Sequence, residues 1–170
     1  MDEKTLPHSI ASGDKAALRQ AYEAYGREMY MFALTLTKGN NTNADDALQE
    51  CFVRVWQSRD KLASVTSLRG YLFTMLRNTF LNLRRTESRE TDRRSRLIVE
   101  GPSGSDVDAE AIDKALNALP EEQRQVVVLK VWGGLTLAEA GQALGIPANT
   151  AASRYRYALG KLRECLGEMQ

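Results

Sequence analysis

The sequence is poor in the residues that build metal and disulfide sites. It has one histidine, His8, and two cysteines, Cys51 and Cys165, which lie far apart in the chain. Two such cysteines exclude a disulfide framework, and so few imidazole and thiolate groups leave a structural zinc site or a metalloenzyme without ligands. We therefore expect no metal and no cofactor, and we interpret both cysteines as small buried residues of helices.

Long apolar runs are also missing. Residues 1–15 are polar and lack the hydrophobic segment of a signal peptide, and no later stretch approaches the length of a membrane span. A glycine-rich phosphate-binding loop is absent as well. We therefore expect a cytoplasmic protein that does not insert into membranes and does not hydrolyse nucleotides.

The chain has almost no net charge, since 23 basic residues face 22 acidic ones and the formal charge is +1. Overall charge thus gives no argument for a nucleic-acid partner, and any such argument must come from the distribution of charge along the chain. Residues 69–96 hold eight arginines and three acids, residues 98–122 hold seven acids and one lysine, and residues 148–163 hold four basic residues and no acid. Two basic blocks around an acidic one predict two separate anionic contacts.

Apolar residues at spacings of three and four predict an all-α protein. One helix is expected from Ser12 or Asp14 to Thr37, and a second starts after Thr42 or Asn43 with acids in its first turn. The further helices are expected at residues 68–85, 109–118, 120–132, 136–144 and 148–166, with Pro120 at the first helical position of its helix.

The stretch between the two groups of helices loses its apolar periodicity. It alternates charges and then reads GPSGS at residues 101–105, the composition of a flexible connector. We predict two small helical domains joined by this linker. The first covers residues 1–86, the linker 87–108, and the second, a four-helix and winged-helix-like unit, residues 109–170.

The second domain contains the helix-starting and helix-ending residues that are typical of a helix-turn-helix. Thr136 and Glu139 have the spacing of a capping box at the start of its first helix. Gly141 permits a close helix crossing, Gly145 permits a left-handed turn, and Pro147 prevents the first helix from continuing. The motif predicts a DNA-binding domain whose last helix enters the major groove.

The outer side of that last helix is polar and basic. Its residues include groups able to contact both bases and phosphates: Asn149, Thr150, Ser153, Arg154, Arg156, Tyr157 and Lys161. A face that serves only solubility usually mixes charges of both signs, whereas no acid occurs between residues 148 and 163. The alternative interpretation is an ordinary solvated face of a bundle helix.

The second expected helix carries a different polar face. Its members share spacings of three and four on the side away from the apolar stripe: Asp46, Gln49, Glu50 and Val53. This face is suited to dock on a basic protein helix. The alternatives are favourable acids near a helix N-terminus and acid–base catalysis, but catalysis lacks a partnering histidine, nucleophile or metal ligand.

The segment from residue 59 to residue 85 combines cations, amides and aromatic rings. The cations are Arg59, Lys61, Arg69, Arg77, Arg84 and Arg85, the amides Asn78 and Asn82, and the rings Tyr71, Phe73 and Phe80. Cations for phosphates and flat groups for unpaired bases are what binding of single-stranded DNA needs. We expect the rings to belong to the core and the arginines and asparagines to contact DNA.

These motifs resemble a known family. The segments DDALQECFVRVW (residues 45–56) and GYLFTMLRN (70–78) resemble region two of extracytoplasmic-function sigma factors. The segment LPEEQRQV (119–126), together with the helix-turn-helix as far as residue 162, is similar to their region four. The two occur in the family's order and cover nearly the whole chain except its N-terminal tip and the linker.

The resemblance implies a sigma factor that directs core RNA polymerase to promoters and opens DNA, without enzymatic activity. The Asp46, Gln49, Glu50 and Val53 face would bind the clamp helices of the polymerase beta-prime subunit, and the beta flap is a second implied contact. The minus-ten element would be melted and held by Lys61, Leu62, Arg69, Arg77, Asn78, Asn82, Arg84 and Arg85, with Leu62, Arg77 and Asn78 nearest the extruded base. The minus-thirty-five element would be read through Ser153, Arg154 and Arg156, with Thr150, Tyr157 and Lys161 beside them.

Further implications concern partners and location. The linker would run towards the polymerase active-site channel, and the protein would associate with the nucleoid when active. Restraint by a separate anti-sigma factor is a hypothesis, because the family often lacks the autoinhibitory first region of larger sigma factors.

Two departures from the family's pattern affect the second domain. The family usually has Gly-Thr-Val and a Lys or Arg before the Ser-Arg pair, whereas this chain has Asn149-Thr-Ala-Ala152, without the cation. It also has Ala140-Gly141 where Ile-Ala is usual, which shrinks the local core. We expect weaker or altered minus-thirty-five contact and a less stable domain.

Two other classes of protein would fit parts of the pattern. A helix-turn-helix repressor or activator with a helical sensor domain would bind duplex DNA as a dimer without polymerase. A helical adaptor, or a decoy for anti-sigma factors, would bind a protein and never touch DNA, and it would tolerate charge reversal at Arg154 and Arg156.

Overall fold

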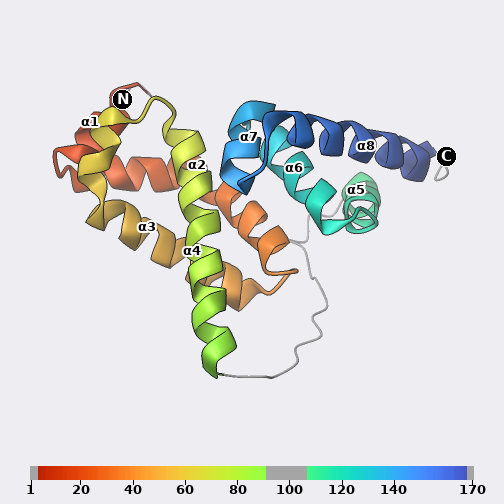
Figure 1. The fold of residues 1–170 in the computed structure, drawn as a ribbon, viewed down its shortest axis with the longest axis horizontal. Coiled ribbons are helices and arrows are strands. Elements are labelled where there is room, and N and C mark those ends of the chain that lie inside the picture. Colours follow the sequence, from red (N-terminus) through yellow and green to blue (C-terminus); the bar gives the residue numbers. More distant parts are fainter. Residues whose placement is uncertain (1–3, 91–106, 168–170) are drawn as a thin grey trace.

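The computed structural model describes residues 4–90 and 107–167, and these residues form α-helices and one short 3₁₀ helix with no strand (Figure 1). The elements are α1 (Leu6–Ala11), α2 (Lys15–Leu36), α3 (Asn41–Gln57), η1 (Arg59–Ser64), α4 (Leu68–Glu90), α5 (Val107–Asn117), α6 (Glu121–Val131), α7 (Leu137–Leu144) and α8 (Ala148–Gly167). The all-α prediction is confirmed. We predicted a four-helix, winged-helix-like second domain. Its four helices, α5 to α8, are present, but no strand accompanies them among the described residues.

Side-chain caps determine where several helices begin. The Asp14 carboxylate accepts hydrogen bonds from the backbone N–H groups of Ala16 and Ala17, so Asp14 rather than Ser12 starts α2. The Asn40 side chain accepts from the N–H of Asn43 at 2.9 Å and starts α3 earlier than we predicted. The expectation of acids in the first turn of this helix is therefore wrong, because the first turn holds none.

Three further elements differ from the sequence prediction. Helix α1 was not expected, yet its Leu6 and Ile10 are buried and it packs against η1, which forms inside the predicted loop 58–67. One pair of apolar residues four apart is too short a pattern for periodicity to reveal. Pro120 is the N-cap of α6 rather than its first helical residue.

Helices α4 and α5 extend into both ends of the stretch predicted as a linker, which spans residues 87–108. The remaining part, residues 91–106, lies outside the described residues. The predicted domain boundaries stay a prediction.

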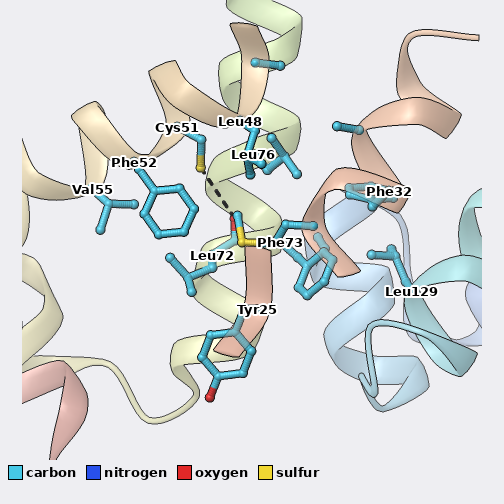
Figure 2. Packing of buried hydrophobic residues seen from close by; sticks show 14 of the residues in the cluster. Tyr25, Phe32, Leu48, Cys51, Phe52, Val55, Leu72, Phe73, Leu76 and Leu129 are labelled. Carbon is cyan, nitrogen blue, oxygen red and sulfur yellow. Dashed lines mark hydrogen bonds between the residues drawn. The ribbon is translucent and has the colours of Figure 1, made fainter. Parts of the chain in front are cut away.

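The main hydrophobic core joins the two groups of helices. Helices α2, α3 and α4 pack together, and the same cluster continues into α6 and α7. Figure 2 shows Leu129 of α6 beside Phe32 of α2 and Phe73 of α4, and the two phenylalanine ring centres are 5.8 Å apart. All three side chains are fully buried. A smaller cluster of Leu116, Leu119, Val127 and Ala158 holds α5, α6 and α8 together.

Cys51 is a core residue, as predicted. Its thiol is buried and lies 3.9 Å from the carbonyl oxygen of Leu72 (Figure 2). Burial raises the pKa of this thiol to about 12, so it stays protonated and unreactive at neutral pH. Cys165 on α8 is half-buried.

The core contains one hydroxyl whose removal we expect to stabilise the protein. Thr79 is fully buried in α4, and its Oγ1 has no hydrogen-bond partner among the described residues. Thr79→Val keeps the shape and removes a desolvated polar atom, and it should raise the free energy of unfolding by about 1 kcal/mol. Urea unfolding measures this effect. Thr74→Val on the same helix is the control, since the Thr74 hydroxyl donates to the Gly70 carbonyl at 2.8 Å and its loss should bring no gain.

Candidate nucleic-acid and partner-binding surfaces

The predicted partner-binding face occupies the solvent side of α3. Asp46, Gln49 and Val53 are exposed and Glu50 is half-buried, while the opposite side of the helix is packed in the core. Glu50 Oε1 accepts a 2.8 Å hydrogen bond from Arg54 Nε, an ion pair between residues four apart. This pair was not foreseen, and it holds the Glu50 carboxylate in place on the face.

The helix-turn-helix has the local geometry that the sequence predicted. The Thr136 hydroxyl accepts from the Glu139 N–H at 3.1 Å, and Glu139 Oε2 accepts from the Thr136 N–H at 2.8 Å, which completes the capping box. Gly145 ends α7 with φ of 67°, a left-handed conformation that favours glycine. A Cβ on Gly141 would lie 2.9 Å from the Ile146 carbonyl oxygen, so glycine permits the close crossing of α7 and the turn.

The predicted recognition face of α8 is partly free and partly engaged. Arg156, Tyr157 and Lys161 are exposed, whereas Thr150 and Ser153 are half-buried. Arg154 Nη2 forms a 3.1 Å ion pair with Glu122 of α6, which sequence reasoning missed. Figure 1 shows α8 extending away from α4, with its free end far from the N-terminal helices.

The predicted single-strand contacts divide into two groups. Lys61, Asn78, Asn82, Arg84 and Arg85 are exposed, the last four along the C-terminal part of α4. By contrast, the two arginines nearer the start of this helix are half-buried against the C-terminal helices: Arg69 and Arg77.

Leu62 requires a correction. We expected it beside an extruded base, but its side chain is fully buried in η1 and belongs to the core. The aromatic residues follow the expectation that they are structural. Phe73 and Phe80 are buried, and the Tyr71 hydroxyl lies 3.4 Å from Ser58 Oγ.

Comparison with known proteins identifies the family. Residues 21–90 match the model of sigma-70 region 2, and residues 109–162 match that of sigma-70 region 4. The curated relatives include the extracytoplasmic-function RNA polymerase sigma factor SigL of Mycobacterium tuberculosis, 29% identical over 167 residues that cover 94% of each chain. SigK of Mycobacterium ulcerans, of the same family, is 29% identical over 176 residues, covering 97% of this chain and 94% of the relative. The chain belongs to the extracytoplasmic-function sigma factors.

Solved structures agree with this assignment. The sigma factor RpoE of Bartonella quintana, solved with the anti-sigma factor NepR, matches with a TM-score of 0.69 and 28% identity over 88% of this chain and 96% of that one. CnrH, solved with the cytosolic domain of CnrY, has the same TM-score at 24% identity over 99% of both chains, which shows the shared fold. The protein is thus a sigma factor that directs RNA polymerase to promoters.

Within the described residues, the sigma factor has no helix long and apolar enough to cross a membrane. The same residues contain no cluster of histidine, cysteine and acidic side chains able to hold a metal ion.

Glu139 links the helix-turn-helix to the start of α4, the helix with the predicted single-strand contacts. Glu139 is bonded to the Thr136 N–H and to the Ser67 hydroxyl at the start of α4, and it faces the Arg69 guanidinium. The Thr136 backbone bond foremost, then the Ser67 hydroxyl, holds the pKa of Glu139 below its usual range, with a smaller contribution from Arg69.

This lowered pKa predicts a pH-dependent difference between the sigma factor and its Glu139→Gln variant. A glutamine still accepts the Thr136 hydrogen bond but lacks the charge, so at pH 7 the variant should be less stable by under about 1 kcal/mol. The folded-state pKa is below the unfolded value of about 4.3, so the charge stabilises above that pH and the benefit is lost as the pH falls through the folded pKa. Unfolding titrations at decreasing pH should therefore converge, and a gap that widens in acid contradicts the assignment.

Arg124 is a structural residue that the sequence analysis did not single out. Its guanidinium donates to the backbone carbonyls of Leu116, Asn117 and Leu119 at 2.9 to 3.1 Å, at and just beyond the C-terminal end of α5. The sequence feature that could have identified Arg124 is its place in the LPEEQRQV segment, a few residues after the end of a predicted helix.

Proposed function

We propose that the sigma factor uses three separate surfaces: the α3 face for core RNA polymerase, the exposed part of α4 for the minus-ten strand, and α8 for the minus-thirty-five duplex. The observation that carries this proposal is that acidic and basic groups occupy separate exposed faces. Acidic and amide groups cover the solvent side of α3, and basic groups without any acid occur over residues 148–163 of α8.

The α3 face supports a protein contact. It is a continuous solvent-facing strip in which the apolar Val53, 49% exposed, lies beside Gln49 and the Glu50 carboxylate, which is paired with Arg54. An exposed apolar residue within a polar strip suits a helix that brings both aliphatic and basic side chains. We assign this strip to the clamp helices of the beta-prime subunit, and the C-terminal unit to the beta flap.

The exposed half of α4 supports a contact with unpaired DNA. Arg84 and Arg85 supply charge for phosphates, and Asn78 and Asn82 supply amides able to pair with base edges. Arg84 lies 5.7 Å from the centre of the Phe80 ring, a cation–π contact that positions its guanidinium. Leu62 is not part of this surface, because it is buried.

The proposed mechanism is binding without a chemical step. Once the sigma factor is attached to polymerase, its second DNA contact is intramolecular, and effective concentration supplies affinity that each unit alone lacks. Strand opening needs no nucleotide hydrolysis when captured bases offset the stacking that is lost, a few kcal/mol for each flipped base. The protein would act in the cytoplasm at the nucleoid, where polymerase and promoters are.

An anti-sigma factor is a proposed further partner. Both structural relatives, CnrH and RpoE, were solved with a second protein bound, and for RpoE that protein is an anti-sigma factor. Affinity purification of the chain from its native cells tests this partner. A protein recovered in stoichiometric amounts supports it, and recovery of polymerase subunits alone contradicts it.

The test of the proposed function is a titration of the fluorescently labelled full-length chain with bacterial core RNA polymerase, followed by transcription from a promoter library. Saturable binding and promoter-dependent transcripts support the sigma mechanism. Binding to duplex DNA as a dimer without polymerase would instead indicate a helix-turn-helix repressor or activator. Protein binding that survives charge reversal at Arg154 and Arg156, without any DNA binding, would indicate an adaptor.

A further inference from the structure

An acidic residue of α6 touches the recognition face of α8. Arg154 Nη2 lies 3.1 Å from Glu122 Oε2, and the Glu122 side chain is 71% exposed while that of Arg154 is 27% exposed. No acid occurs between residues 148 and 163, so this part of α8 supplies no acidic partner of its own. The carboxylate that Arg154 contacts therefore comes from another helix.

The position of Glu122 relative to α8 is set by contacts on two sides. Val127 of α6 is buried with Ala158 of α8 in the smaller hydrophobic cluster. Close to Glu122 in the chain, the Arg124 guanidinium donates to backbone carbonyls at and just beyond the end of α5, at 2.9 to 3.1 Å. The start of α6 is thus anchored, and it keeps the Glu122 carboxylate within reach of Arg154.

Stability of the fold does not account for this ion pair. A pair in which one partner is as exposed as Glu122 is screened by water and contributes little to folding. The favourable interaction of an acid with a helix N-terminus is available to Glu121 as well, since both acids lie in the first turn of α6. Glu122 differs from Glu121 in its contact with a residue of the recognition face.

A carboxylate beside an arginine changes which acceptor the guanidinium favours. A phosphate carries a full negative charge and is repelled by Glu122, whereas the edge of a guanine offers the neutral acceptors O6 and N7. The contact with Glu122 engages one nitrogen of Arg154, and the remaining donors of the planar fork can meet both guanine atoms. As α8 displaces water from the groove, the ion pair strengthens and fixes the orientation of that fork.

We propose that Glu122 is a positioning residue, which turns Arg154 away from phosphates and towards a guanine of the minus-thirty-five element. The inference rests on the proposed minus-thirty-five function of α8 and assigns a role to one further residue. Phosphate contacts are then left to Arg156 and Lys161, which are both exposed.

The test measures how strongly the holoenzyme distinguishes bases. Core RNA polymerase is saturated with the full-length sigma factor and titrated with a library promoter whose minus-thirty-five element contains G·C pairs. It is then titrated with duplexes in which each of these pairs is replaced in turn by A·T. In the wild-type holoenzyme, one replacement should weaken binding on the order of tenfold.

Glu122→Gln should change specific and non-specific binding in opposite directions. The discrimination at that G·C pair should fall at least about threefold, because the Arg154 fork is no longer oriented. The affinity for a duplex without promoter sequence should rise and depend more steeply on salt, because Arg154 becomes available to phosphates. A merely structural role of Glu122 would lower both affinities together, and that result overturns the proposal.

Glu121→Gln is the matched control, because it removes the same charge from the same turn of α6 and leaves Glu122 in place. It should keep the wild-type discrimination. The second control introduces Glu122→Gln in an Arg154→Ala background, where it should change discrimination no further if Glu122 acts through Arg154. Equal loss of discrimination in Glu121→Gln, or a further loss in the Arg154→Ala background, overturns the positioning role.

Failure of the positioning role and failure of the proposed function give different results. If Arg154→Ala loses discrimination and Glu122→Gln keeps it, Glu122 does not position Arg154, and the proposed function of α8 stands. If the wild-type holoenzyme binds every replaced duplex as tightly as the original promoter, α8 does not read these base pairs, and the proposed function fails together with the positioning role.

Discussion

The double variant Gln49→Ala, Glu50→Lys is expected to bind core RNA polymerase at least about a hundredfold more weakly than the wild-type sigma factor. The substitutions remove an amide from the centre of the α3 face and reverse the charge that a basic partner helix would meet. Loss of Glu50 also frees Arg54 from its 2.8 Å ion pair, so two cations replace one neutralised pair. A fluorescence titration with labelled protein measures the change.

The control for this prediction makes the same two kinds of substitution outside the α3 face. Gln20→Ala with Asp60→Lys changes an exposed amide and an exposed acid on α2 and η1, and it should bind polymerase as wild type does. Thermal unfolding of both variants should stay close to wild type, because exposed substitutions rarely change stability by more than about 0.5 kcal/mol and the half-buried Glu50 loses only a surface ion pair with Arg54. Full-strength binding by the Gln49→Ala, Glu50→Lys variant would remove α3 from the polymerase interface.

Charge reversal on α8 should produce the second large effect, confined to promoter binding. Arg156→Glu with Lys161→Glu alters two exposed cations of the recognition face, and the Arg156 guanidinium lies 5.8 Å from the centre of the Tyr157 ring. We expect transcription from a promoter with a minus-thirty-five element to fall at least about a hundredfold, with core polymerase binding retained. The dependence of promoter affinity on salt should weaken, because fewer counterions are released.

Lys15→Glu with Arg19→Glu provides the matched control. Both residues are exposed at the start of α2, outside the matched region-two segment, and the change in net charge is the same. This control should keep promoter activity. If the α8 variant also keeps it, the recognition role of α8 is wrong, and if it loses polymerase binding as well, α8 acts through the polymerase instead.

The ion pair of Arg154 with Glu122 bears on the missing cation of this helix. The family's usual Lys or Arg before the Ser-Arg pair is Ala152 here, and Arg154 is already paired within its own domain. Any DNA phosphate must compete with Glu122 for this guanidinium, which adds to the expectation of weaker minus-thirty-five contact. Arg156 and Lys161 are therefore the stronger candidates for phosphate contacts.

Local features of the protein could be predicted from its sequence because they depend on near neighbours. The Thr136 and Glu139 capping box, the left-handed Gly145 and the close approach at Gly141 all arise within ten residues of chain. The solvent side of α3 likewise follows from helical periodicity, since its buried and exposed residues alternate at spacings of three and four. Periodicity gave too little signal for α1, a single short helix that is stabilised by packing on η1 and α2.

Contacts between distant segments were decided only by the tertiary structure. The family resemblance implied that Leu62 lies beside an extruded base, but packing places its side chain in the core. Arg69 and Gly133 are 64 residues apart, and nothing in either neighbourhood indicates that an exposed-looking cation meets a backbone carbonyl. By itself the sequence determined the family, the all-α class, the helix-turn-helix and the faces of α3 and α8, because these depend on local spacing and chemistry. Tertiary packing decided which arginines of α4 are free, because a guanidinium donates to whichever acceptor the fold brings to it.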